Sequence, residues 1–164
     1  MRVPQHIVDR RRAENKPETR RVVIGLRQRD GRTLTFVGKS EPEGVAIARR
    51  VVSKGSTIVA DEAGHWDSLP VDYATHRINH SLAYSMDGVS TNQIESFFAR
   101  LRRMIDGQHH HVSPRYLHAY AAHAAWLEDH RRLDNGATTY RAAGLALAHP
   151  TSPTWKGYWQ RAAR

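Results

Sequence analysis

The 164-residue chain contains no cysteine. This absence excludes disulfide bonds, a zinc ribbon, an iron–sulfur cluster and a thiol nucleophile. Long apolar runs are also missing, because no stretch approaches the roughly 18–20 residues that a membrane-spanning helix needs. The basic residues 1–21 are not followed by the apolar run of a signal peptide. We therefore expect no membrane segment, and a soluble protein that resides in the cytoplasm.

Lysine is scarce, with four residues against 21 arginines in a chain of formal net charge +9. Arginine binds phosphate with a two-pronged geometry that lysine lacks, so nucleic acid is the first partner to consider. A bias in genome base composition explains the same preference equally well. The charge is also uneven. Residues 1–60 hold 14 cations and 6 anions, residues 61–99 hold one cation and six anions, and residues 100–164 hold 10 cations and 4 anions.

An acidic middle within a basic chain suits an enzyme that processes phosphodiesters. Cations would hold the DNA backbone, while clustered carboxylates would hold a divalent metal ion at the phosphate to be cleaved. Ordinary fluctuation of composition in a window of 39 residues is the simpler explanation. The identity of individual residues is needed to distinguish a phosphodiester-processing enzyme from such a fluctuation.

The first half of the chain predicts a hairpin, a helix and a buried strand. Residues 20–28 are apolar and rich in β-branched residues, and residues 33–37 alternate between polar and apolar. The turn between them offers Gly31 for a position with positive φ. Residues 43–52 have helical spacing and end before Gly55. The strand that follows, 56–60, ends directly on Asp61-Glu62.

The second half predicts mainly helices. The clearest helix carries one apolar stripe at helical spacing, formed by Ile94, Phe97, Phe98, Leu101 and Ile105. The other expected elements, in chain order, are a short helix or turn at 66–73, a strand at 75–80, a loop at 82–89, a helix from Pro114 to about Leu133 that stops at Asn135-Gly136, and a last helix at about 138–148.

These elements predict a mixed α/β fold divided into three parts. Residues 1–19 form a basic arm, residues 20–135 form the core, and residues 136–164 form a C-terminal helix and an aromatic tail packed on the core.

Two acidic residues are the candidate catalytic and metal-binding groups. Asp61 follows a buried strand, at the edge where α/β sheets bind ligands, although Asp61 or Glu62 could equally cap the next turn. Glu95 fits a capping box with Asn92. Asn92, Glu95 and Arg102 also share one helix face, distinct from the apolar stripe.

The surroundings of these residues resemble a known family. Residues 91–103 read TNQIESFFARLRR, and Gly107 and His110-His111-Val112-Ser113 follow. This block resembles the DDE-type insertion-sequence transposases of the ISXO-type domain family. The Asp61-Glu62 strand end, Trp66 and residues 78–81 match the preceding segment of that family, and Arg131-Arg132 match the end of its long helix.

The resemblance implies a ribonuclease-H-like catalytic core for metal-dependent DNA strand cleavage and transfer. Asp61 would be the second and Glu95 the third of three acids that hold Mg²⁺ or Mn²⁺ in the complete family enzyme. Arg102 stands where many relatives have lysine, and it would contact DNA phosphate. The other implied DNA-binding residues are Asn92, Arg103, His110 and His111. The implied partners are transposon ends, target DNA and further copies of the chain.

One part of the family pattern is missing. Its first acid lies on an opening strand, whereas only Asp9 and Asp30 precede Asp61 as aspartates, and neither lies on a central strand. We therefore expect a truncated, inactive transposase whose mixed sheet lacks its first, central strand. The alternatives are a non-catalytic DNA-binding remnant that modulates or inhibits intact transposase, and a relic without function. A transition-metal site at His109–His111 is less favoured, because consecutive residues rarely converge on one ion.

Overall fold

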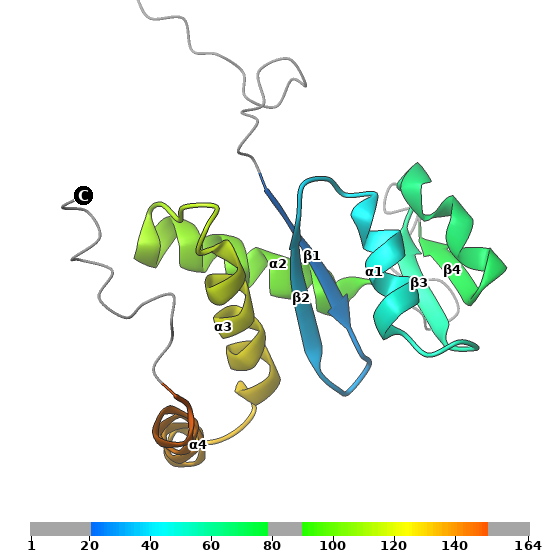
Figure 1. The fold of residues 1–164 in the computed structure, drawn as a ribbon. Helices are drawn as coiled ribbons and strands as arrows, with labels where there is room; N and C mark the ends of the chain where they lie inside the picture. The colour runs from blue at the N-terminus through cyan, green and yellow to red at the C-terminus, as the bar shows by residue number, and fades with distance from the viewer. Residues whose placement is uncertain (1–20, 79–89, 151–164) are drawn as a thin grey trace, which may run out of the picture. The chain divides into compact units, whose positions relative to one another are not determined.

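The computed structural model describes residues 21–78 and 90–150. The chain divides into two compact units, Met1–Asp129 and His130–Arg164. The first unit combines short sheets with helices, so the predicted mixed α/β class is confirmed (Figure 1). The predicted arm, the loop at 82–89 and the aromatic tail lie outside the described residues. No helix in the described part of the chain is long and apolar enough to cross a membrane.

The predicted hairpin is present. Strands β1 (Val22–Arg27) and β2 (Thr33–Gly38) pair antiparallel, from Val22 opposite Gly38 to Arg27 opposite Thr33. The prediction for the turn was wrong by one residue, because Asp30 has the positive φ (54°) and Gly31 does not. Aspartate is among the residues that tolerate this region, since its short side chain bonds to nearby backbone.

A second sheet contains β3 (Thr57–Asp61) and β4 (Ala74–Ile78), which pair in parallel. Parallel strands need a long crossover connection, and here it contains the 3₁₀ helix η2 (Gly64–Val71). Helix α1 (Glu43–Val51) precedes β3 and ends, as predicted, before Gly55, which has φ of 80°. The two sheets have two strands each, and no ladder joins them in the described residues.

Side-chain packing around Gly44 connects the two sheets. A Cβ atom at Gly44 would lie 2.7 Å from Cη2 of Trp66 and 3.5 Å from Cγ2 of Ile24, so α1 is in close contact with η2 and with β1. The apolar cluster on this side consists of Val45, Ala48, Leu69 and Tyr73, with Val52, Ile58 and Trp66 packed against it.

Helix α2 (Asn92–Met104) packs against β1 and continues into one turn of π-helix, η3 (Ile105–His109). The predicted apolar stripe of α2 faces the core, where Phe97 is 1% exposed. Gly25 of β1 permits this close packing, since a Cβ atom there would lie 2.9 Å from both Ile94 Cδ1 and Phe98 Cζ.

Helix α3 (Leu117–His130) is fixed to α2 and to the hairpin by two consecutive carboxylates near its end. Glu128, 7% exposed, accepts a hydrogen bond from Nε of Arg100 at 2.7 Å. Asp129 accepts hydrogen bonds from the backbone N–H and hydroxyl of Thr33, and it is ion-paired with Arg27.

Two predicted helix ends were wrong. Pro114 is not the first residue of α3, because residues 114–116 form a turn in which Tyr116 N–H bonds to the carbonyl of Ser113. Asn135-Gly136 does not mark a stop but opens α4 (Asn135–Ala148). The side chain of Asp134 caps α4 by accepting a hydrogen bond from the backbone N–H of Ala137. This N–H group is one of the donors at a helix start that have no partner within the helix.

We predict that Gly44→Val lowers the free energy of unfolding by about 1–3 kcal/mol more than Ala46→Val does. Both changes place a β-branched residue in α1, but Ala46 is exposed whereas Gly44 touches Trp66 and Ile24. Urea denaturation measures the difference. Equal effects of the two substitutions would contradict the packing role of Gly44.

Candidate functional site

Asp61 is the last residue of β3 and its side chain is exposed. Its Oδ1 atom accepts two hydrogen bonds, from Nε1 of Trp66 at 2.9 Å and from the backbone N–H of Ala63 at 3.2 Å. Among the described residues, Oδ2 has no hydrogen-bond partner. Asp61 therefore caps the following turn, as its simpler interpretation predicted, and still has one carboxylate oxygen available to a ligand.

Arg77 of β4 holds the backbone of the same turn. Its guanidinium donates to the carbonyl oxygens of Asp61 at 2.6 Å and of Ala63 at 2.8 Å, and it is ion-paired with Asp67 at 2.7 Å. Arg77 is the one cation within residues 61–99. The positive charge of this acidic segment is thus in direct contact with the backbone of the turn that follows Asp61.

Glu95 lies in the first turn of α2 and is exposed. The capping box predicted for Asn92 and Glu95 was wrong, because the N-cap residue is Thr91 and not Asn92. Thr91 is buried, and its hydroxyl is 2.6 Å from Oε1 of Glu95. This bond between residues one helical turn apart fixes the glutamate side chain against the start of α2.

The polar face predicted on α2 is present and accessible. Asn92, Arg102 and Arg103 are exposed, on a helix whose Phe97 and Leu101 point into the core. Neither Arg102 nor Arg103 has an ion-pair partner among the described residues, in contrast to Arg100. A polyanion can therefore reach both guanidinium groups without breaking an existing ion pair.

The three successive histidines form a tight turn after η3. His110 has φ of 54° and ψ of −35°, and the backbone N–H of His111 donates to the carbonyl of His109. Such a γ-turn is rare and strained in a residue with a Cβ atom. His110 and His111 are exposed, whereas the ring of His109 packs edge-on against Tyr120 at 4.5 Å.

The donor chemistry fits a divalent metal ion only in part. Asp61 and Glu95 offer the carboxylate oxygens that Mg²⁺ and Mn²⁺ prefer. However, no group of three or more His, Asp or Glu side chains within residues 21–78 and 90–150 is arranged to hold a metal ion. No hydrogen bond in this part of the chain links the Asp61 turn to the Thr91–Glu95 pair. The described residues thus offer two candidate ligands but not a complete metal centre.

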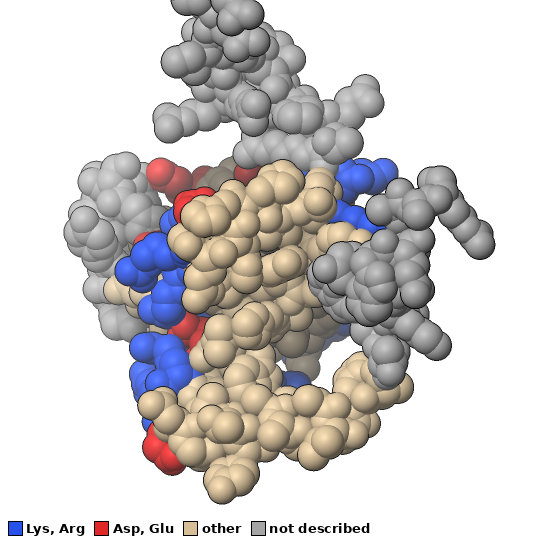
Figure 2. Space-filling model, turned by 90° about the vertical axis from the view of Figure 1, so that its left-hand side faces the viewer, with Lys and Arg blue, Asp and Glu red and all other residues tan. Residues whose placement is uncertain are grey.

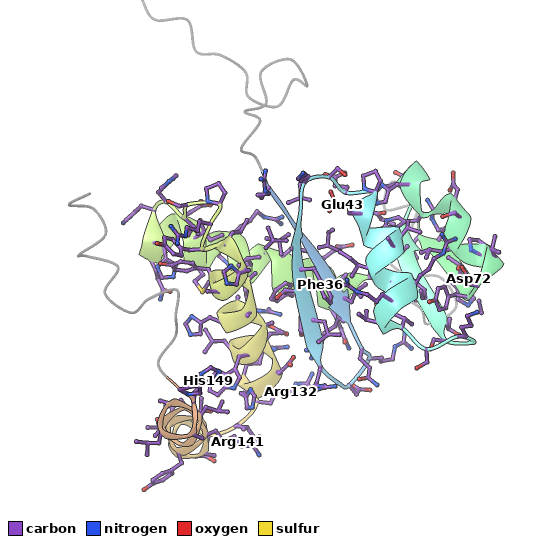
Figure 3. All side chains as sticks on the ribbon, viewed as in Figure 1. Phe36, Glu43, Asp72, Arg132, Arg141 and His149 are labelled. Carbon is purple, nitrogen blue, oxygen red and sulfur yellow. The ribbon has the colours of Figure 1, made fainter. Side chains whose placement is uncertain are left out.

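The space-filling view shows how charge is distributed over one face. In Figure 2 exposed Lys and Arg side chains, in blue, lie close to Asp and Glu side chains, in red. Figure 3 labels two arginines outside α2, Arg132 in the turn that follows α3 and Arg141 in α4. The basic character seen in the sequence is therefore not confined to α2.

The comparison with family models decides the affiliation. The model of the ISXO2-like transposase domain matches residues 2–129. The chain belongs to this family. Searches of curated proteins and of solved structures returned no match. The resemblance inferred from the 91–113 block is thus confirmed, and the matched range includes Asp61, Glu95 and the histidine turn of this transposase domain.

Sequence reasoning missed the residues that surround the two acids in this transposase domain. In the sequence, Trp66 is only a match to the family and Thr91 only the first residue of the 91–113 block. Arg77 carried a signal, because it is the single cation in an acidic segment. The contacts themselves depend on how η2 packs against α1, which no local pattern specifies.

We predict that His110→Gly leaves the transposase domain more stable than His111→Gly, by about 1 kcal/mol. Both variants lose one exposed imidazole, but only position 110 has a positive φ, which glycine adopts without the steric cost of a Cβ atom. Chemical denaturation of the two variants tests this order. A lower stability for His110→Gly would show that the γ-turn is not strained.

Proposed function

We propose that this chain acts in the transposition of an insertion sequence, as a DDE-type catalytic domain with a ribonuclease-H-like core. Membership of the ISXO2-like family supports the reaction class. The observation that carries the proposal is Asp61, an exposed carboxylate at the C-terminal end of a parallel strand with one oxygen unengaged in the described structure. This edge is where α/β sheets bind ligands.

The arrangement of strands supports the ribonuclease-H-like core. An antiparallel pair, β1–β2, and a parallel pair, β3–β4, are both in contact with the α1 and η2 region. Each pair has unpaired outer edges in the described residues, and one strand inserted between β1 and β3 would join them into a single five-stranded mixed sheet. Exposed strand edges favour such pairing, because their N–H and C=O groups have no partners.

Asp61 and Glu95 are the proposed ligands of Mg²⁺ or Mn²⁺. Such ions, when bound, generate the attacking oxygen nucleophile and stabilise the leaving oxygen of the phosphodiester. Three acids are expected for this chemistry, and the described residues supply two candidates. We therefore expect the 164-residue polypeptide by itself to cleave no DNA.

The proposed DNA contacts lie on α2 and the histidine turn. Arg102 and Arg103 would bind backbone phosphates, since their guanidinium groups are exposed and unpaired in the described structure. Asn92 lies at the start of the same helix, and His110 and His111 project from the turn that follows η3. Several copies of the chain would be needed to hold two transposon ends.

A second candidate function is DNA binding without catalysis, in which the chain modulates or inhibits an intact transposase by joining its assembly. The lack of a group of three ligands in the described residues favours this candidate. It shares the DNA contacts of the first proposal and differs from it in needing no metal ion.

Strand cleavage of DNA from the ends of the corresponding insertion sequence tests for catalysis by this chain, and a mixture with intact transposase tests the second candidate. We expect no cleavage by the chain alone with Mg²⁺ or Mn²⁺. Cleavage that Glu95→Gln abolishes would contradict this expectation and establish an active enzyme. In a mixture with intact transposase, a decrease in cleavage that depends on the dose of this chain would support the inhibitory role.

We predict that Arg102→Glu with Arg103→Glu weakens DNA binding and lowers the slope of log affinity against log salt by about two, because about one counterion is released for each phosphate contact. Arg50→Glu with Lys54→Glu is the matched control, since it changes the charge equally on the exposed side of α1 and the loop after it. Fluorescence anisotropy at several salt concentrations measures the slopes. Equal slopes for the two double variants would refute the assignment of the α2 face.

A further inference from the structure

The turn that follows Asp61 is held by more interactions than a surface turn requires. Trp66 bonds to the side chain of Asp61, and Arg77 bonds to the backbone on both sides of Glu62. Neither residue has a role in the function proposed above. We propose that Trp66 and Arg77 are positioning residues, which orient the Asp61 carboxylate so that Oδ2 is presented to a divalent cation.

The indole of Trp66 is held in place by its packing. Its Cη2 atom lies 2.7 Å from the position that a Cβ atom would occupy at Gly44, and its ring is 4.4 Å from the ring of His65. The Nε1–H group is therefore a donor at a fixed position. A carboxylate bonded to a fixed donor loses rotational freedom, which lowers the entropic cost of binding a metal ion.

Arg77 acts on the backbone of the same turn. It donates from Nε to the carbonyl of Asp61 and from Nη2 to the carbonyl of Ala63, while Asp67 pairs with its Nη1. The planar guanidinium makes these bonds in one fixed geometry, which the single ammonium group of lysine does not reproduce. Main-chain and side-chain atoms of Asp61 are thus fixed by two different residues.

The result is an asymmetric carboxylate. Oδ1 accepts from Trp66 Nε1–H and from the N–H of Ala63, and Oδ2 has no partner among the described residues. Metal ligands in proteins are commonly oriented by such outer hydrogen bonds. This inference rests on the proposed function, because it assigns the ligand role to Asp61. A turn-capping role alone would need the bond from Ala63 but not the one from Trp66.

The test uses NMR spectra of the full chain labelled with ¹⁵N at its tryptophan indoles, with Trp66→Phe assigning the Trp66 resonance. In the absence of metal, Asp61→Asn is expected to shift the Trp66 indole proton and to speed its exchange with solvent. Glu62→Gln, the control at the neighbouring exposed carboxylate, is expected to leave the resonance in place. An indole resonance that Asp61→Asn does not move would overturn the positioning role of Trp66, whatever the chain does with metal.

The second arm adds Mn²⁺ at less than one equivalent. Paramagnetic broadening of the Trp66 indole resonance, absent at Trp126 of α3 and lost in Asp61→Asn, is the expected result. Broadening of neither resonance would overturn the assignment of Asp61 as a metal ligand in the proposed function, and the metal-presenting role with it, even if the first arm succeeds. The two failures are thus distinguishable.

The positioning role of Arg77 is tested with Arg77→Lys, which keeps the positive charge and changes the geometry of the hydrogen-bond donors. We expect about a tenfold weaker Mn²⁺ affinity, the lower end of the effect of losing an outer hydrogen bond at a metal site. The broadening of the Trp66 resonance measures this affinity. The matched control is Arg49→Lys, because Arg49 pairs with Asp72 away from the turn. Equal affinities in the two variants would overturn the role of Arg77.

Discussion

The packing at Gly44 is the constraint on which the rest of the first unit depends. The two sheets contain two strands each and share no ladder in the described structure. A two-stranded sheet is marginally stable by itself in water. Helix α1 contacts Ile24 on one side and Trp66 on the other. This packing therefore holds the two sheets together, as backbone hydrogen bonds do in a continuous sheet. The same contact fixes the indole that bonds to Asp61, so stability and the candidate site share one residue.

The carboxylates of the chain fall into two groups with different surroundings. Glu128 and Asp129 are paired with Arg100, Arg27 and Thr33, and these bonds join α3 to α2 and to the hairpin. Breaking such a pair leaves a partly buried charge without its partner, which costs more than the pair contributes. Asp61 instead is exposed, and its hydrogen bonds engage only one of its oxygens. This contrast separates acids that maintain the fold from the acid that we propose as a metal ligand.

Much of the fold could be predicted from local patterns. The alternation in 33–37 predicted the second strand of the hairpin, and the apolar stripe from Ile94 to Ile105 predicted α2. Both patterns are local, because the periodicity of a strand or helix depends on residues close together in the sequence. Element ends were less predictable. Thr91 replaced Asn92 as the cap of α2, and Asp134 caps a helix whose start at Asn135-Gly136 had suggested a stop. Several residue types can cap a helix, and tertiary packing selects among them.

The family could also be predicted, since the 91–113 block is distinctive in sequence, and the metal-ligand roles of Asp61 and Glu95 stay predictions. The partners of those acids could not. Trp66 reaches Asp61 only because the 3₁₀ helix η2 folds back over α1, and Arg77 reaches the turn only through the parallel pairing of β3 with β4. Both contacts are products of the tertiary structure.

A crystal structure of the chain grown with Mn²⁺, with the ion located by its anomalous scattering, tests the central claim most directly. We predict an Mn²⁺ ion bound to Oδ2 of Asp61 while Oδ1 keeps its hydrogen bond from Trp66. The carboxylate of Glu95 is predicted to be a ligand of the same ion or of a second ion about 4 Å away. Mn²⁺ bound only at other side chains, with Asp61 and Glu95 both unliganded at saturating metal, would contradict it.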